Sequence, residues 1–170
     1  MTDGSALLTS LFHALRARSL WSDAREANLL DGGTPFYRCY ACRDGGFVAV
    51  GALEPRFYAA LIKGLGLTPD EAPQFDRDGW PALQARLKAL FATRDRDDWA
   101  AHFAGTEACV TPVLSLTEAA DHPHNRARGT FAEAGIVQPA PAPRFAAEAA
   151  PISADRPALS LDQALADWAI

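Results

Sequence analysis

The spacing of apolar residues changes along the chain from a helical period to a strict alternation and back. In the first part of the chain, apolar side chains recur at three- and four-residue intervals at Leu7, Leu8, Leu11, Phe12 and Leu15. This period predicts one amphipathic helix from Asp3 to Arg18. Ser19 to Thr34 shows no period, so we expect a linker there and a partner for the helix stripe outside this chain.

An alternating pattern begins after Pro35 and predicts a β-hairpin. Phe36 to Cys42 alternates with a period of two, and Phe47 to Gly51 is apolar and largely β-branched or aromatic. The residues Arg43 to Gly46, which include two glycines, are typical of a turn between paired strands. Unlike the N-terminal helix, whose packing partner is expected outside this chain, each strand of the hairpin has its partner in the sequence.

The second strand of this hairpin runs directly into a short helix. Pro55 suits a first helical position, the apolar residues after it recur every four positions, and Gly64 is a natural residue to follow the last turn. Glu54 therefore stands at the helix N-terminus. Glutamate is not a favoured N-cap, so two interpretations are open: an exposed acid that the helix dipole stabilises, or an acid or base held rigidly between two elements.

Further helices and one strand complete the predicted small domain. A helix begins near Trp80 and Pro81, and a shorter one begins near Asp95 and ends at Gly105. Cys109 to Leu114 is β-prone but contains Pro112, which restricts it to an edge or a strand end. Ser115 and Glu118 form a capping box for a short helix that ends near His122.

The C-terminal third is expected to be mostly extended. His122 to Leu159 shows no regular period, and the three prolines of Gln138 to Arg144 predict a polyproline-like strap. Leu161 to Trp168 is the last predicted helix, with Ser160 and Gln163 as its capping box.

Composition and charge exclude several functions. The 170 residues are 49% hydrophobic and 22% charged, with a net charge of −5 and a pI near 5.3. We therefore expect an ordinary globular protein and no nucleic-acid partner. The sequence shows neither a signal-peptide pattern nor a long uncharged span, so we expect no membrane partner and a cytoplasmic location.

No metal site is expected. Cys39 and Cys42 form a CxxC motif, but residues three apart on a strand point to opposite faces, so the two thiols are not expected to bind one metal ion. We expect reduced thiols that are buried or half-buried. His122 and His124 offer two ligands without a clear third, and a loop with partly exposed histidines explains them better. Walker loops, dinucleotide glycine signatures, HExxH and GxSxG do not occur in the sequence.

Three long runs resemble one family. GTPFYRCYACRDGGFVAVGALEPRFYAALIKGLGL, GTEACVTPVLSLTEAADHPHNRARGTF and QPAPAPRF resemble the C-terminal half of the α-methylacyl-CoA racemases, which belong to the family III (CaiB/BaiF-like) CoA-transferases. The resemblance runs from about Asp3 to about Phe145. It implies that the half carrying most of the CoA site and the main catalytic His and Asp has no counterpart here.

The fold class that follows is α+β. We expect a helix and linker at 1–33, a small α+β domain with a hairpin-based sheet at 34–120, and an extended linker with a C-terminal helix at 121–170. The resemblance implies that this last part leads toward a CoA-binding large domain, supplied by an N-terminal segment or subunit. It also implies a homodimer in full-length relatives, with the active site between the large domain of one subunit and the small domain of the other.

Three functions are compatible with these residues. The resemblance favours racemisation of 2-methylacyl-CoA thioesters through an enolate, with acyl-CoA as substrate and no further cofactor. The alternatives are a family III acyl-CoA transferase and a non-catalytic, truncated or associating subunit. The resemblance points to Glu54 as the carboxylate that faces the catalytic groups of the other half. Tyr37 and Leu53 are candidate acyl contacts, because Leu53 adjoins Glu54 and Tyr37 lies on the strand paired with the one before it.

Overall fold

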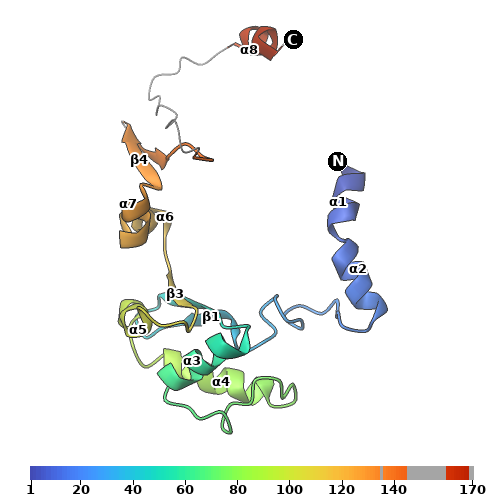
Figure 1. Ribbon diagram of the computed structural model, residues 1–170, viewed down its shortest axis with the longest axis vertical. Coiled ribbons are helices and arrows are strands. Elements are labelled where there is room, and N and C mark those ends of the chain that lie inside the picture. The colour runs from blue at the N-terminus through green and yellow to red at the C-terminus, as the bar shows by residue number, and fades with distance from the viewer. Residues whose placement is uncertain (135, 145–159, 169–170) are drawn as a thin grey trace. The chain divides into compact units, whose positions relative to one another are not determined.

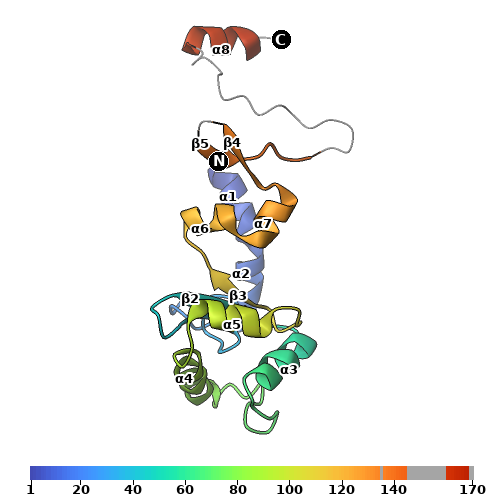
Figure 2. The ribbon, with the colours of Figure 1, turned by 90° about the vertical axis from the view of Figure 1, so that its left-hand side faces the viewer.

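The computed structural model describes residues 1–134, 136–144 and 160–168 (Figures 1 and 2). The chain divides into two compact units, Met1–Val113 and Leu114–Ile170. The first unit contains a three-stranded sheet with its helices, and the second contains a two-stranded sheet. The structure is α+β, as the sequence predicts.

The central sheet is built on the predicted hairpin. β1 (Tyr37–Ala41) pairs antiparallel with β2 (Phe47–Gly51), which pairs antiparallel with β3 (Val110–Val113), so β2 lies in the middle. Pro112 lies on β3, which is an edge strand. This confirms the prediction that Pro112, which has no N–H group to donate, is restricted to an edge or a strand end. Each strand is short, and its stability depends on what covers the sheet.

Three helices cover one face of this sheet: α3 (Pro55–Gly64), α4 (Trp80–Phe91) and α5 (Arg96–Phe103) (Figure 2). Tyr40 stacks on Phe91 with ring centroids 5.0 Å apart, and Phe91 meets Trp99 edge-on at 5.2 Å. The polar ends of the buried rings are satisfied, since Trp99 Nε1 donates to the Phe91 carbonyl at 2.9 Å. These helices therefore fix the sheet from one side through a core rich in aromatic rings.

The end of α3 differs from its prediction. Gly64 is the last residue of the helix, and Gly66, with φ +72°, takes the left-handed position after it. Gly66 N–H donates to the Lys63 carbonyl at 3.1 Å and Leu67 N–H to the Ile62 carbonyl at 3.0 Å, which is the Schellman arrangement. Gly64 instead makes room for α5, because a Cβ there would lie 2.3 Å from Phe103 Cε1.

The loop between α3 and α4 is tied by one carboxylate. Glu71 accepts hydrogen bonds from Thr68 N–H and Oγ1, both at 2.9 Å, and from Arg86 of α4 at 2.7 Å. The bond from the Arg86 guanidinium and those from Thr68 lower the pKa of Glu71 to about 2. The ionised carboxylate therefore favours the folded loop.

The N-terminal segment forms two helices where one was predicted, so that prediction is wrong in detail. α1 (Thr2–Leu8) and α2 (Ser10–Ala17) meet at Thr9, whose hydroxyl donates to the Ala6 carbonyl at 2.8 Å. Such a local bond competes with the helical ladder. The apolar stripe is largely exposed: Leu8 is 82% and Leu11 63% accessible.

The second unit corrects the prediction that His122 to Leu159 lacks regular structure. After the capping box of α6 (Leu116–Asp121), which is confirmed, come α7 (Pro123–Arg128) and a hairpin of β4 (Phe131–Ala134) and β5 (Ile136–Pro139). Gly129, with φ 56°, ends α7 and starts this hairpin. The predicted polyproline strap is thus wrong for its first residues, while 145–159 lie outside the described residues.

The C-terminal helix is confirmed. α8 (Leu161–Trp168) begins with Gln163 N–H donating to Ser160 Oγ at 3.2 Å, and Ser160 N–H donates back to Gln163 Oε1 at 3.0 Å. Among the described residues, none of the helices is long and apolar enough to cross a membrane.

The close approach of Gly64 to Phe103 gives a stability prediction. Gly64→Ala should lower the free energy of unfolding by about 1–3 kcal/mol, because the added methyl group must displace a buried ring. Urea unfolding measures this loss. Gly4→Ala is the matched control, since a Cβ at this helical glycine has no atom within 4 Å. Equal urea midpoints for wild type and Gly64→Ala would contradict the packing.

Glu71 gives a pH prediction. Its pKa in the folded chain lies below the ordinary value of 4.5, so its contribution to stability is complete above that pH and is lost as the pH falls toward about 2. Wild type should therefore exceed Glu71→Gln in stability at neutral pH, and the gap should close in acid. Arg86→Met should shrink the same acid-dependent part. A gap that stays constant from pH 6 to pH 2 would refute this role.

Candidate functional site

Glu54 stands where β2 passes into α3. It is the N-cap residue of α3, with φ −74° and ψ 144°, and its side chain makes no capping hydrogen bond. The carboxylate is exposed. Its backbone is fixed on both sides by the buried Ala52 and by Pro55 at the first helical turn. The backbone of Glu54 is therefore fixed, while its exposed carboxylate is not used for capping.

Tyr37 and Cys109 lie at the same end of the sheet as Glu54. Tyr37 is the register partner of Gly51, the last residue of β2, and Gly51 N–H donates to the Cys109 carbonyl at 2.9 Å. Burial and the neighbouring Glu54 carboxylate raise the pKa of the Cys109 thiol, while Arg56 opposes them. This places the charge of Glu54 within electrostatic reach of Cys109.

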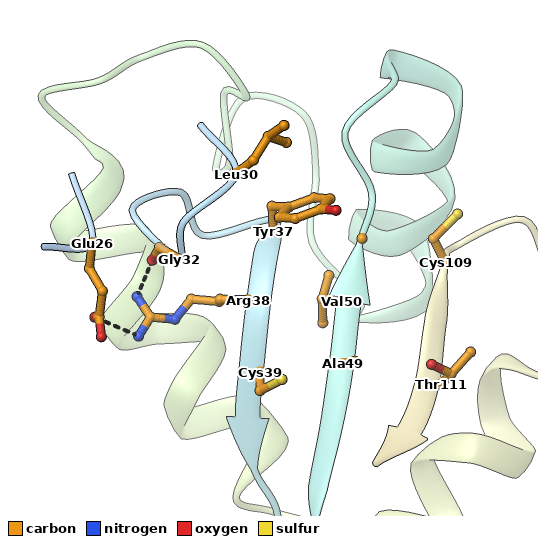
Figure 3. A pocket seen from close by; sticks show the side chains of 11 residues that line it. Glu26, Leu30, Gly32, Tyr37, Arg38, Cys39, Ala49, Val50, Cys109 and Thr111 are labelled. Atoms are coloured by element: carbon orange, nitrogen blue, oxygen red, sulfur yellow. Dashed lines mark hydrogen bonds and ion pairs between the residues drawn. The ribbon is translucent and has the colours of Figure 1, made fainter. Parts of the chain in front are cut away.

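The face of the sheet opposite the helices is uncovered. The register brings Tyr37, Cys39, Ala49, Gly51 and Thr111 to this face, and each is exposed or half-buried. Small side chains in the middle of the face leave a shallow depression of about 760 Å³ (Figure 3).

Leu53 lies apart from this depression. It is half-buried and packs against the core, and its carbonyl accepts a hydrogen bond from Gln74 Nε2 at 2.8 Å. Tyr37, in contrast, lines the depression and is 36% accessible. Of the three candidate residues, Tyr37 and Glu54 thus mark one end of the sheet, and Leu53 faces the core beside them.

The cysteines correct one expectation. Cys42 is buried, but Cys39 and Cys109 are exposed, because both lie on the side of the sheet that no helix covers. Cys39 and Cys42 point to opposite faces, as predicted. Over the described part of the chain, no group of three or more His, Cys, Asp or Glu side chains could hold a metal ion.

One wall of the depression was missed by sequence reasoning. Glu26, Leu30 and Gly32 belong to the segment expected to be a linker, yet they line the depression together with Arg38 of β1 (Figure 3). The segment contains no helix or strand, as predicted, but it is ordered by Asn28 and Asp31. Asn, Asp and Gly close together were the available signal, since they favour compact turns.

Comparison with known proteins gives a consistent result. The family model described as CoA-transferase family III matches residues 4–163. The chain is 47% identical over 146 residues to human alpha-methylacyl-CoA racemase and 45% identical over 144 residues to the mouse racemase. It is 37% identical over 145 residues to the CaiB/baiF CoA-transferase family protein ZK892.4 of Caenorhabditis elegans.

These matches cover most of this chain but less than half of each relative. They include 84% of the chain and 38% of the human protein, so the chain spans about two fifths of the length of the curated relatives it matches. Among solved structures, Rv3272 from Mycobacterium tuberculosis superposes with a TM-score of 0.59 at 15% identity, covering 71% of this chain and 37% of Rv3272. That likeness concerns the fold alone. The family match over 4–163 and the agreement of the relatives show that the chain belongs to CoA-transferase family III.

Proposed function

We propose that the chain supplies the small-domain part of an enzyme that racemises 2-methylacyl-CoA thioesters. The observation that carries this proposal is the 47% identity to human alpha-methylacyl-CoA racemase over 84% of the chain. A CoA-binding large domain, from an N-terminal segment or a separate subunit, would complete the site. In this proposal the assembled enzyme is a homodimer, and the chain alone does not turn over substrate.

The proposed reaction moves one proton and breaks no bond between heavy atoms. A base removes the proton at C2 of the acyl group, the thioester oxygen carries the enolate charge, and an acid returns a proton to the opposite face. The partners that face Glu54 in this step come from the large domain. Glu54 supports them with a fixed negative charge or by exchanging a proton with one of them.

The geometry around Glu54 supports this role. Glu54 is the N-cap residue of α3, and the start of this helix fixes the backbone that carries its carboxylate. The depression begins at the same end of the sheet and is lined there by Tyr37, which in this proposal contacts the acyl group. Leu53 supports this end from the core side. No redox cofactor is needed for such chemistry, and the CoA thioester is the substrate.

CoA transfer is the second candidate, because the matching family model carries that description. In a transfer, the bond between the acyl carbon and the CoA sulfur breaks, and CoA passes to a free acid. In racemisation that bond survives and the C2 hydrogen exchanges with solvent. A third candidate, a subunit that acts only by association, would show neither event.

Incubation in deuterated water separates these candidates. The full chain is co-expressed with the N-terminal part of human alpha-methylacyl-CoA racemase and incubated with (2R)-2-methyldecanoyl-CoA. We expect deuterium at C2 and formation of both epimers, measured by mass spectrometry and chiral chromatography. Transfer of CoA to an added carboxylic acid without deuterium at C2 would support the transferase instead. Absence of both events in a stable complex would overturn the proposed chemistry.

Glu54→Gln tests the site within that assembly. It should lower kcat by about tenfold or more and leave KM nearly unchanged, because an acid, base or charge acting on the transition state is lost. In the chain alone it should change the free energy of unfolding by about 1 kcal/mol or less, the scale of an exposed helix-end charge.

Glu107→Gln is the matched control for this variant. Glu107 is also an exposed carboxylate that raises the pKa of Cys109, but it lies outside the N-terminus of α3. It should leave kcat within about twofold of wild type, because it removes no group at the helix end. Unaltered turnover of Glu54→Gln would show that Glu54 is only a helix-end charge.

A further inference from the structure

The segment from Ser22 to Gly33 holds its own conformation without helix or strand. Asn28 is 7% accessible; its Oδ1 accepts from Ser22 N–H at 2.8 Å, and its Nδ2 donates to the Asp31 carboxylate at 2.7 Å. Asp31 also accepts from Asn28 N–H at 2.8 Å and from Gly33 N–H at 3.1 Å. Each polar group of the buried amide therefore has a partner, which disfavours alternative conformations.

Close packing of the backbone adds to this order. A Cβ on Gly33 would lie 2.7 Å from both the N and the O atoms of Asn28, so the two backbone stretches touch without room for a side chain. Thr34, which follows, is fully buried, and its hydroxyl donates to the Leu29 carbonyl at 3.2 Å. The segment is thus a compact loop with a preformed surface.

Arg38 joins this loop to the sheet. Its Nη1 donates to the Gly32 carbonyl at 2.9 Å, and its Nη2 lies 3.5 Å from the Glu26 carboxylate (Figure 3). Only 20% of the Arg38 side chain is accessible. A partly buried guanidinium that bridges a carbonyl and a carboxylate is held more firmly than an exposed ion pair.

The two contacts of Arg38 fall on residues that line the depression. Glu26 and Gly32 form part of its wall, and Arg38 itself lines it next to Tyr37 (Figure 3). Among the residues that the structure describes, no side-chain hydrogen bond or ion pair other than those of Arg38 ties Glu26 or Gly32 to the sheet. The loop keeps its own fold through Asn28 and Asp31, and the Arg38 side chain of β1 docks it against the sheet as a wall of the depression.

We propose that Arg38 is a positioning residue of the substrate site, which fixes the loop Glu26–Gly32 as a wall of the depression before substrate arrives. The inference rests on the proposed function for the identity of the ligand, an acyl-CoA thioester. Arg38 acts on affinity by preorganising the wall, since a loop that must become ordered on binding weakens the complex. It takes no part in proton transfer.

Hydrogen exchange on the full chain tests the positioning step without any catalysis. Arg38→Met keeps an apolar stem but removes both donors. Backbone amides of residues 27–33 should then exchange about tenfold faster, while those of β2 keep their protection. Arg25→Met is the matched control, because Arg25 also pairs with Glu26, at 3.8 Å, but is 95% accessible and has no bond to Gly32.

Equilibrium binding tests the consequence for substrate. In the assembly with the large-domain part, Arg38→Met should raise the Kd of 2-methyldecanoyl-CoA about fivefold. Arg38→Lys keeps the positive charge but lacks the guanidinium group that donates to two partners, so it should recover part of the lost affinity. Arg25→Met should bind as wild type does. The rate of deuterium exchange at C2 under saturation should stay within about twofold of wild type for all three variants.

The outcomes separate this inference from the proposed function. If the wild-type assembly binds the thioester but exchanges no deuterium at C2, the proposed racemase activity is wrong. The role of Arg38 is then decided by whether Arg38→Met raises the Kd of the thioester. Unchanged Kd or unchanged amide exchange in Arg38→Met would overturn the role of Arg38 whatever the chemistry. A wild-type assembly that does not bind the thioester would overturn both.

Discussion

The pairing of β2 between β1 and β3 is the constraint on which the rest of the structure depends. Its antiparallel register places Gly51 between Tyr37 and Cys109. The chain then needs only a short connection to start α3, so Glu54 is fixed at the same end of the sheet. A shift of this register by one residue would turn every side chain of β2 to the opposite face. The core and the candidate site are therefore set by one pairing.

The two faces of the sheet differ in burial and in the side chains they carry. The covered face carries Tyr40, Val48 and Val50, which are almost inaccessible and pack under the helices. The uncovered face carries small side chains and two thiols, and its hollow is closed on one side by a loop that Arg38 holds. Antiparallel sheets commonly bury one face and leave the other solvated, so this sheet is stabilised mainly through its covered face.

Local signals account for most of what the sequence predicted well. Alternation gave the hairpin, Pro55 and Pro81 marked helix starts, and Ser115 with Glu118 marked a capping box. Tertiary packing decided the rest. Gly64 was predicted to follow the last turn of its helix but makes room for Phe103, and at Thr9, where α1 and α2 meet, the hydroxyl bonds to the Ala6 carbonyl. The loop before β1 was missed because its order comes from Asn28 and Asp31 bonding each other, a pattern without periodicity. Glu54 and Tyr37 were chosen from spacing and family resemblance, and their roles remain predictions.

The central claim is that the uncovered face, with Glu54 at its end, is half of a site that another domain completes. The alkylation rates of the three thiols test it most directly, because Cys39 and Cys109 line that face and Cys42 is buried on the other. Iodoacetamide labelling, resolved by mass spectrometry, should modify Cys39 and Cys109 in the chain alone. In the assembly with the large-domain part, both rates should fall by about tenfold or more, as expected when a surface is buried. Equal rates for Cys39 and Cys109 in the free chain and in a stable assembly would contradict the account.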